Sequence, residues 1–335
     1  MISSVDSAKI RNILVFALSN IGDAVLNTPV ISVLKEQFPD SYLCLLISPK
    51  AAPIFAGSKL IDEIAIYDKH TSWLQKLSLV RKLRKKKFDL IVDLRNSAIP
   101  FFVGAKYRTS YFVDRSAPSM RKRHLDRIRF LISSEPHRNR FDFFSDTEKK
   151  SAVEKAKAKS AQIRQNEFVI IAPGAGSALK RWNLSGFAEV INHFTQKKKK
   201  SVVLIGWDQE HELGVELERM ASGPIINLIG ALNLRESAGL ISQASLVIAN
   251  DSAVMHLAHE LNRPTVSIFG PTDPKKYSQI GANRRMVKMP LDCSPCEAAT
   301  CQLERRICLD DLPSSSVIQA SEELLNLNYE ADQSF

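Results

Sequence analysis

The chain has 335 residues, of which 44% are hydrophobic and 24% are charged, and its formal net charge is +10. This length accommodates two domains of about 150 residues each, and the composition is typical of a soluble globular protein. No apolar run approaches the roughly 18 residues that a membrane-spanning helix needs. The N-terminal segment contains Asp6 and lacks a small-residue cleavage site after its short apolar run, so it is not a secretory signal. The sequence therefore predicts a cytoplasmic protein.

The positive charge is concentrated in one part of the chain. Residues 69–140 contain 19 Lys and Arg against 5 Asp and Glu, and the basic runs at 81–87 and 121–129 dominate this segment. One such run is typical of a solvated helix face, but an excess confined to one domain favours an anionic partner. Acidic lipid headgroups or an anionic glycan fit better than nucleic acid, because aromatic residues do not interleave with the basic ones.

Strand-like and helix-like segments alternate along the first half of the chain, as in parallel sheets whose strands are joined by helices. The predicted strands are 11–17, 42–47, 62–67 and 89–93, and the predicted helices are 23–37 and 72–86. Residues 100–145 are irregular, aromatic and basic. The polar segment 147–166 is typical of a boundary helix or linker.

The second half repeats the alternation. Its predicted strands are 168–173, 201–206, 225–230, 245–250 and 264–270, and its predicted helices are 184–196, 208–221, 233–242, 252–262 and 314–327. The expected fold class is therefore α/β, with two Rossmann-like parallel-sheet domains. The expected boundaries are 1–150 for the N-terminal domain, 151–166 for the linker, 167–312 for the C-terminal domain and 313–335 for a closing helix and tail.

Unusual residues follow several predicted strands, and ligands of such sheets bind beyond the carboxyl ends of the strands. Gly22 and Asp23 follow the first strand, and PGAGSALKRW (173–182), NDS (250–252) and FGPTDP (269–274) follow later ones. Turn chemistry explains some of these positions, but not all four together. They predict a ligand site at the ends of the strands.

The sequence contains neither a dinucleotide fingerprint nor a P-loop, and it has no Asp-x-Asp pair for a divalent metal. Bound phosphates would therefore be neutralised by basic side chains and helix N-termini. Lys180 and Arg181 follow two glycines that allow close backbone approach; the alternative is an ordinary surface loop. Asp251 or Ser252 would cap a helix whose free N–H groups form an anion site, with His256 one turn inside as either a ligand-binding or a structural residue.

Asp23 has two interpretations. A carboxylate at the corner between the first strand and its helix can be an N-cap, which contributes about 1 kcal/mol. It can instead accept the proton of a substrate hydroxyl as a general base. The position alone does not separate the two.

Four segments together resemble glycosyltransferase family 9, the ADP-heptose:lipopolysaccharide heptosyltransferases. They are NILVFALSNIGDAVLNTPVISVLKEQFP, IAPGAGSALKRWNLSGFAEV, ANDSAVMHLAHELNRPTVSIFGPTDP and the late cysteine-rich segment. The resemblance spans residues 11–310 and implies a GT-B fold with two domains facing across a cleft. It also implies metal-independent inverting transfer, with the nucleotide on the second domain and the acceptor on the first.

The resemblance assigns roles to individual residues. Asp23 matches the catalytic aspartate, supported by Gly22. The leaving diphosphate would be met by the residues Lys180, Arg181, Asp251, Ser252, Ala253 and His256, with Gly176 and Thr272 in support. Glu210 would accept hydrogen bonds from the ribose, Leu232 would pack near adenine, and Trp182 would anchor a helix. Ala253 and Val254 stand where the family usually has glycine and proline.

The expected function is thus transfer of a sugar to a lipopolysaccharide core acceptor, with heptose from ADP-heptose as the expected donor. That acceptor is anionic and lies at the inner face of the cytoplasmic membrane, so the resemblance together with the basic domain predicts peripheral membrane association and no nucleic-acid partner. The alternatives are a nucleotide-sugar epimerase of the same fold and a non-catalytic nucleotide-sugar-binding relative. The retention of Asp23 together with Lys180, Asp251 and His256 argues against the non-catalytic alternative.

Four of the five cysteines form a late cluster, Cys293, Cys296, Cys301 and Cys308, while Cys44 is separate. Disulfides are not expected in the cytoplasm. The spacing fits a structural zinc site, but reduced loop cysteines are the favoured interpretation. Neither a cofactor nor a catalytic metal is expected.

Overall fold

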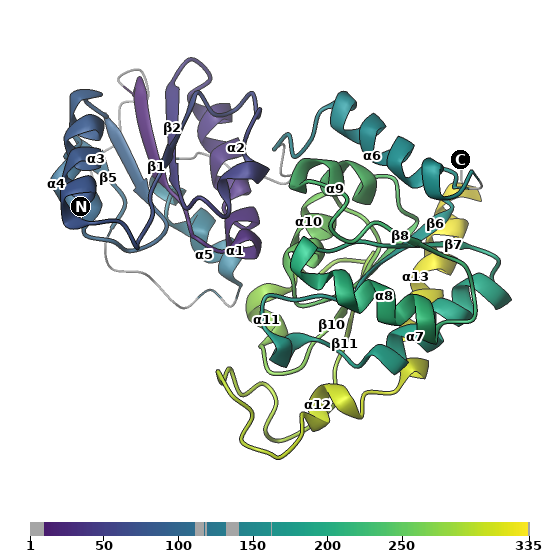
Figure 1. Ribbon diagram of the computed structural model, residues 1–335. Coiled ribbons are helices and arrows are strands. Elements are labelled where there is room, and N and C mark those ends of the chain that lie inside the picture. The colour runs from purple at the N-terminus through teal and green to yellow at the C-terminus, as the bar shows by residue number, and fades with distance from the viewer. Residues whose placement is uncertain (1–9, 111–116, 118, 132–140, 162, 334–335) are drawn as a thin grey trace. The chain divides into compact units, whose positions relative to one another are not determined.

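The computed structural model describes residues 10–110, 117, 119–131, 141–161 and 163–333 (Figure 1). The chain divides into two compact units, Met1–Phe143 and Phe144–Phe335. Asp6 and residues 132–140 of the basic segment lie outside the described residues. Within the described part of the chain, no helix is long and apolar enough to cross a bilayer.

The first unit is built on a parallel sheet with the strand order β3-β2-β1-β4-β5. Its strands are β1 (Asn12–Phe16), β2 (Tyr42–Ile47), β3 (Glu63–Ile66), β4 (Leu90–Asp93) and β5 (Tyr107–Arg108). Strands β1, β2 and β4 are almost fully buried, because helices cover both faces of a parallel sheet and the strands carry continuous aliphatic runs.

Short helices connect these strands. They are α1 (Ile21–Val25), α2 (Thr28–Gln37), α3 (Trp73–Lys85), α4 (Ile99–Val103) and α5 (Met120–Asp126), with 3-10 turns η2 (Ala52–Ile54) and η3 (Arg129–Leu131). The single helix predicted at 23–37 is wrong: the chain ends α1 and starts a second helix. Pro29 lies in the first turn of α2, where a missing N–H costs nothing, so it begins a new helix.

The second unit contains a parallel sheet in the order β11-β10-β9-β6-β7-β8. Its strands are β6 (Phe168–Ala172), β7 (Ser201–Leu204), β8 (Ile225–Asn227), β9 (Leu246–Asn250), β10 (Thr265–Ile268) and β11 (Arg284–Val287). The predicted strands are confirmed at each position, although most are shorter by one to three residues at their ends. The polar edge strand β11 was not predicted.

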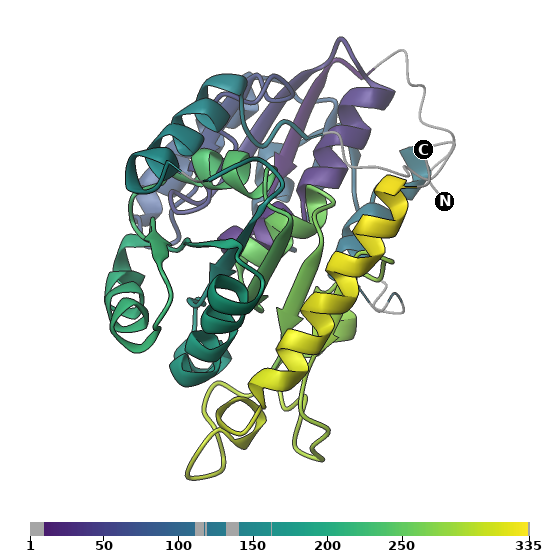
Figure 2. The ribbon, with the colours of Figure 1, turned by 90° about the vertical axis from the view of Figure 1, so that its right-hand side faces the viewer.

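The helices of the second unit surround this sheet. They are α6 (Asp146–Lys159), α7 (Leu184–Asn192), α8 (His211–Met220), α9 (Leu234–Ile241), α10 (Ala253–Glu260), α11 (Pro274–Tyr277), α12 (Ile307–Asp310) and α13 (Ser314–Gln333), with the short turns η4 (Ala178–Lys180), η5 (His193–Lys197) and η6 (Asp208–Glu210). Helix α6 packs against α9 and belongs to this unit. Figure 2 shows α13 running beside the sheet, where it contacts β10 and β11.

Both sheets have a topological switch point. In the first unit, the strand order reverses between β1 and β4; in the second, it reverses between β6 and β9. Loops that leave the carboxyl ends of such neighbouring strands diverge and open a crevice in which ligands bind. Asp23 follows β1, and Lys180 and Asp251 follow β6 and β9. Each unit thus places predicted site residues at its own switch point.

Candidate functional site

A polar cluster occupies the switch point of the second unit. Lys180 ends the turn η4 after β6, and its Nζ lies 2.7 Å from Oδ2 of Asp251, which directly follows β9. The Asp251 carboxylate is buried, whereas the Lys180 side chain is 30% exposed. An ammonium group has three donors, and the described contacts use one of them on Asp251. The buried Asp251 carboxylate therefore fixes the position of the partly exposed Lys180 ammonium group.

Two more predicted residues complete this cluster. Thr272 comes from the loop after β10, and its hydroxyl donates to Oδ2 of Asp251 over 2.8 Å. His256 lies one turn inside α10, with Nε2 3.8 Å from Oδ1 of Asp251. Thr272 and His256 are both buried. The side chains from three neighbouring strand ends thus converge on one carboxylate.

The N-terminus of α10 lies at the same place. Ser252 is its N-cap, as one of the two alternatives predicted, but its side chain makes no capping hydrogen bond. The Ser252 hydroxyl is buried and has no partner among the described residues. Ala253 is the first helical residue, so the backbone N–H groups around it have no intrahelical acceptor. An unpartnered hydroxyl next to free N–H groups is suited to an anion.

Asn250 positions the glycine-containing loop; it belongs to the NDS segment noted in the sequence, but no role was predicted for it. It is fully buried at the end of β9, its Nδ2 donates to the Pro173 carbonyl (2.8 Å), and its Oδ1 accepts from the Trp182 N–H (3.0 Å). Trp182 is buried, stacks edge-on against Phe187 and donates to the Leu312 carbonyl over 3.1 Å. It anchors α7, as expected. A buried amide at a strand end was the signal for Asn250.

The structure describes the surroundings of Arg181 and of the two glycines in this loop. The Arg181 guanidinium turns back to the Ala175 carbonyl (3.1 and 3.2 Å), so it braces the loop. A Cβ added to Gly176 would meet nothing within 4 Å, so no protein atom requires glycine there. At Gly174, by contrast, an added Cβ would lie 2.0 Å from the Glu210 carboxyl group. A side chain at Gly174 would therefore displace the Glu210 carboxyl group.

Glu210 and Leu232 lie after β7 and β8. Glu210 is buried, accepts from the Trp207 N–H over 2.9 Å and lies over Gly174 and Gly206. Its carboxyl group thus lies between the loops that follow β6 and β7. Leu232 is half-buried in the turn between β8 and α9. Neither residue touches the Asp251 cluster through a described hydrogen bond.

Asp23 lies in the first turn of α1 in the first unit. The N-cap of this helix is Asn20, so Asp23 is not the cap and that alternative is wrong. The carboxylate is half-buried, and its Oδ2 accepts from Nδ2 of Asn20 over 3.1 Å. The preceding loop is fixed by Arg95, which donates to the Ser19 hydroxyl, and by Ser48, which donates to the Ser19 carbonyl over 2.7 Å. Asp23 thus has a defined position and an accessible oxygen.

A buried pair lies beneath Asp23. Oδ1 of Asn27 accepts from the Leu18 N–H (2.9 Å), which leaves its Nδ2 to donate to Nδ1 of His124 over 2.9 Å. Nδ1 of His124 also lies 3.3 Å from the Leu26 carbonyl, so the imidazole is held between these two groups. Burial lowers the pKa of His124 to about 4, and the nearby Asp23 charge opposes this shift without reversing it.

His124 predicts a pH dependence of stability. The pKa of His124 is lower in the folded state than its ordinary value of 6.5, so at acid pH the unfolded state binds more protons. The contribution of neutral His124 to stability is therefore complete above pH 6.5. It is lost as the pH falls toward 4. The loss amounts to about 3 kcal/mol in the free energy of unfolding. Urea unfolding across this range measures it. The His124→Gln variant is expected to flatten the profile, whereas exposed His70→Gln should not; equal slopes in all three proteins would contradict the prediction.

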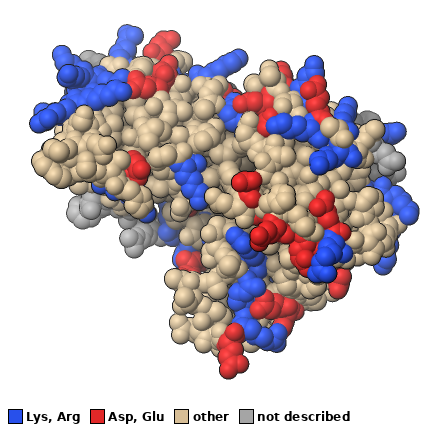
Figure 3. Space-filling view, in the orientation of Figure 1, with Lys and Arg blue, Asp and Glu red and all other residues tan. Residues whose placement is uncertain are grey.

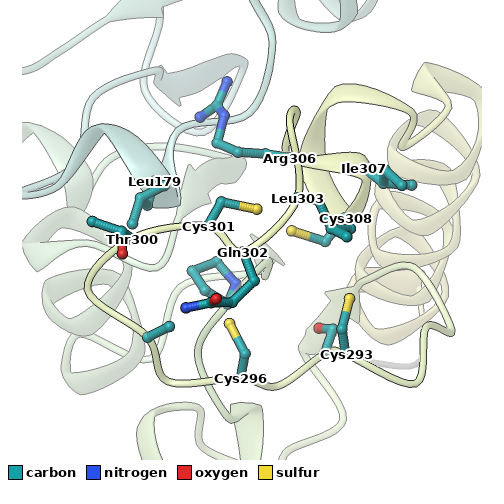
Figure 4. Close-up of a pocket in the computed structure, with 13 residues that line it drawn as sticks. Leu179, Cys293, Cys296, Thr300, Cys301, Gln302, Leu303, Arg306, Ile307 and Cys308 are labelled. Atoms are coloured by element: carbon teal, nitrogen blue, oxygen red, sulfur yellow. The ribbon is translucent and has the colours of Figure 1, made fainter.

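The late cysteines surround a cavity of about 100 Å³ in the loop before α12 (Figure 4). All four are free thiols. Burial raises the pKa of Cys308, and the neighbouring Cys293, Cys301 and Cys296 raise it further. In the described part of the chain, no three His, Cys, Asp or Glu side chains are arranged to hold a metal ion. Reduced loop cysteines stay the favoured prediction, and a structural zinc site stays the alternative that the spacing allows.

The two parallel sheets, each with its site residues at a switch point, are those of a GT-B protein, and solved structures share this fold. A glycosyltransferase family 9 protein from Veillonella parvula has a TM-score of 0.80 at 19% identity and matches 96% of this chain and 99% of its own. E. coli ADP-heptose LPS heptosyltransferase II has a TM-score of 0.73 at 21% identity, with 95% and 99% coverage.

The sequence comparisons identify the family. Residues 76–307 match the model of glycosyltransferase family 9 (heptosyltransferase). Lipooligosaccharide heptosyltransferase 2 of Campylobacter jejuni is 30% identical over 325 residues, which cover 91% of this chain and 96% of the relative. The chain belongs to glycosyltransferase family 9 and is a glycosyltransferase.

Proposed function

We propose that this enzyme transfers heptose from ADP-heptose to a lipopolysaccharide core acceptor, with inversion at the anomeric carbon. The observation that carries the proposal is the cluster of Lys180, Asp251 and Thr272 beside the unpartnered Ser252 hydroxyl at the N-terminus of α10. In this proposal, basic and polar groups of the protein bind the anion. The relatives named for heptosyl transfer to lipopolysaccharide or lipooligosaccharide support this choice of donor and acceptor.

The donor diphosphate would bind at this cluster. The Lys180 ammonium, the Ser252 hydroxyl and the N–H groups at the start of α10 supply donors that are in place before the reaction begins. Such preorganised donors stabilise the charge that develops on the leaving diphosphate. His256 lies close enough to Asp251 to extend this donor set. Glu210 would accept from the ribose hydroxyls and Leu232 would lie near the adenine.

Asp23 would act as the general base. The acceptor oxygen attacks the anomeric carbon on the side opposite to the diphosphate, and the bond between that carbon and the diphosphate oxygen breaks. The acceptor proton passes to the Asp23 carboxylate, and ADP leaves with the bonding electrons. Asn20, which donates to Oδ2 of Asp23, leaves the other oxygen for the acceptor hydroxyl. The proposal requires both sites to act on the same donor molecule.

The acceptor is the glycan of a membrane lipid, so the enzyme would work at the inner face of the cytoplasmic membrane. The segment 69–140 has a net excess of basic residues, with 19 Lys and Arg against 5 Asp and Glu. Each Lys or Arg near an anionic membrane surface contributes about 1 kcal/mol. We expect peripheral association through the first unit.

The test is acceptor-dependent release of ADP from ADP-heptose, with truncated, heptose-poor lipopolysaccharide as acceptor. Mass spectrometry of the product is expected to show the addition of one heptose. Glucose and N-acetylglucosamine linked to ADP or UDP serve as competing donors, and they should react much more slowly. A faster reaction with one of them would overturn the choice of heptose, and release without acceptor would overturn the transferase mechanism.

A further inference from the structure

Helices α3 and α4 of the first unit pack against each other and expose large apolar side chains. On α3, Trp73 is 67% exposed and Leu74 is 60% exposed, and Leu77 is exposed as well. On α4, Phe101 and Phe102 are 50% and 64% exposed. Scattered apolar side chains are normal on a surface, but five of them on two adjoining helices form a patch.

The apolar side chains of α3 share one face with basic ones. At 3.6 residues per turn, Trp73, Leu74 and Leu77 fall within an arc of about 120° that also contains Arg81, Arg84 and Lys85. All six are exposed, and only Leu83 of this helix is fully buried against the sheet. The exposed face of α3 is thus apolar in its first half and basic in its second half.

The basic residues on this face are available to a partner. Arg81, Arg84 and Lys85 make no ion pair with any residue that the structure describes. Lys86, the C-cap residue of α3, is by contrast paired with Glu63 and donates to Tyr42. Figure 3 shows Lys and Arg side chains gathered over the corner of the first unit that α3 occupies in Figure 1.

The aromatic part of the patch also carries positive charge. The guanidinium carbon of Arg108 on β5 lies 4.0 Å from the centre of the Phe101 ring, and Lys106 lies over the ring of Tyr107 at 5.2 Å. A cation over an aromatic face keeps its charge while the ring covers apolar surface. Basic side chains from β5 and the loop before it thus lie beside aromatic residues of α4 and β5.

We propose that the α3–α4 face is the surface by which the enzyme docks on an anionic phospholipid bilayer. Trp73, Leu74 and Phe102 would enter the headgroup region, where amphipathic aromatic rings are favourable, while Arg81 and Arg84 would contact lipid phosphates. A protein groove would take the apolar side chains but gives no reason for the adjacent unpaired cations. The inference rests on the proposed function, because that function places the acceptor at a membrane.

The experiment measures sedimentation of the full-length protein with vesicles made of equal parts of phosphatidylcholine and phosphatidylglycerol. Two triple variants remove the two halves of the face. The basic variant combines Arg81→Gln, Arg84→Gln and Lys85→Gln. The apolar variant combines Trp73→Ser, Leu74→Ser and Leu77→Ser. The basic variant is expected to weaken binding about a hundredfold at low salt. The apolar variant should weaken it at least about tenfold and leave the residual binding more sensitive to salt.

Control variants remove exposed basic or exposed apolar side chains from the second unit. The basic control combines Lys157→Gln, Lys159→Gln and Lys197→Gln. The apolar control combines Val215→Ser and Ile280→Ser. All five positions are exposed. These variants should bind within about twofold of the wild type. Equal weakening by the basic variant and its control would show that total charge, not this face, drives binding. Absence of wild-type binding at low salt would also overturn the proposal.

A second readout separates this inference from the proposed function. Transfer to a soluble truncated acceptor without lipid should be unchanged in both α3 variants, because neither changes a residue of the proposed active site. Loss of vesicle binding with retained transfer supports docking through this face. If the wild type binds vesicles through α3 but transfers no heptose, the proposed function fails while the docking surface stands.

Discussion

Replacement of Asp23 by asparagine is expected to lower kcat for glycosyl transfer by about 10²–10⁴-fold, the range that a positioned general base contributes. The amide keeps the size of the carboxylate and can still contact Asn20, so the loop after β1 should keep its conformation. It cannot take the proton of the acceptor hydroxyl. Because the proposed donor site lies on the other unit, the affinity for ADP should change little.

The measurement is single-turnover transfer with saturating donor and acceptor, together with ADP binding by calorimetry. Asp40→Asn, at an exposed position of the same unit, is the control and should retain full activity. Asp23→Ala should be as inactive as Asp23→Asn. An amide variant with nearly wild-type kcat would show that Asp23 only shapes the corner after β1.

The fold could be predicted well because the central strands of both sheets consist of consecutive aliphatic residues that are buried. Strand β9 (LVIAN) and strand β2 (YLCLLI) are buried on both faces, and this burial leaves few residue types that fit. Two of the four edge strands, β5 and β11, gave no such signal. Strand β5 has two residues, and β11 reads RRMV, with polar side chains that solvent tolerates at an edge. Such strands are defined by pairing, not by local sequence.

The charged residues of the candidate site could be predicted from the sequence, but the roles of the residues that hold its loops in place could not. Lys180 and Asp251 were found from loop composition, and the structure pairs them because their strands are neighbours at the switch point. Arg181 looked equivalent to Lys180, but the carbonyl of Ala175 captures its guanidinium. Gly174 could not be distinguished from Gly176, because the Glu210 side chain that crowds it comes from another loop. Contacts between distant loops decide these cases.

The second prediction with a large expected effect on activity is the replacement of Lys180. Lys180→Met is expected to reduce kcat/KM for ADP-heptose by about 10²–10³-fold, as loss of one preorganised donor to a developing anion does. The control Lys275→Met removes an exposed lysine from α11 of the same unit and should have little effect. Both rates are measured with limiting donor and saturating acceptor, and ADP affinity is measured separately.

A structural explanation would give the same single-variant result, because loss of Lys180 leaves the buried Asp251 carboxylate without its 2.7 Å partner. The double variant Lys180→Met with Asp251→Asn separates the two. The neutral amide needs no counter-ion and can still accept from Thr272, so stability should recover. If Lys180 holds the donor diphosphate, activity should stay low in the double variant, because the phosphate still lacks its cation. Recovery of activity together with stability would assign Lys180 to the support of Asp251 and leave the diphosphate to Ser252 and the start of α10.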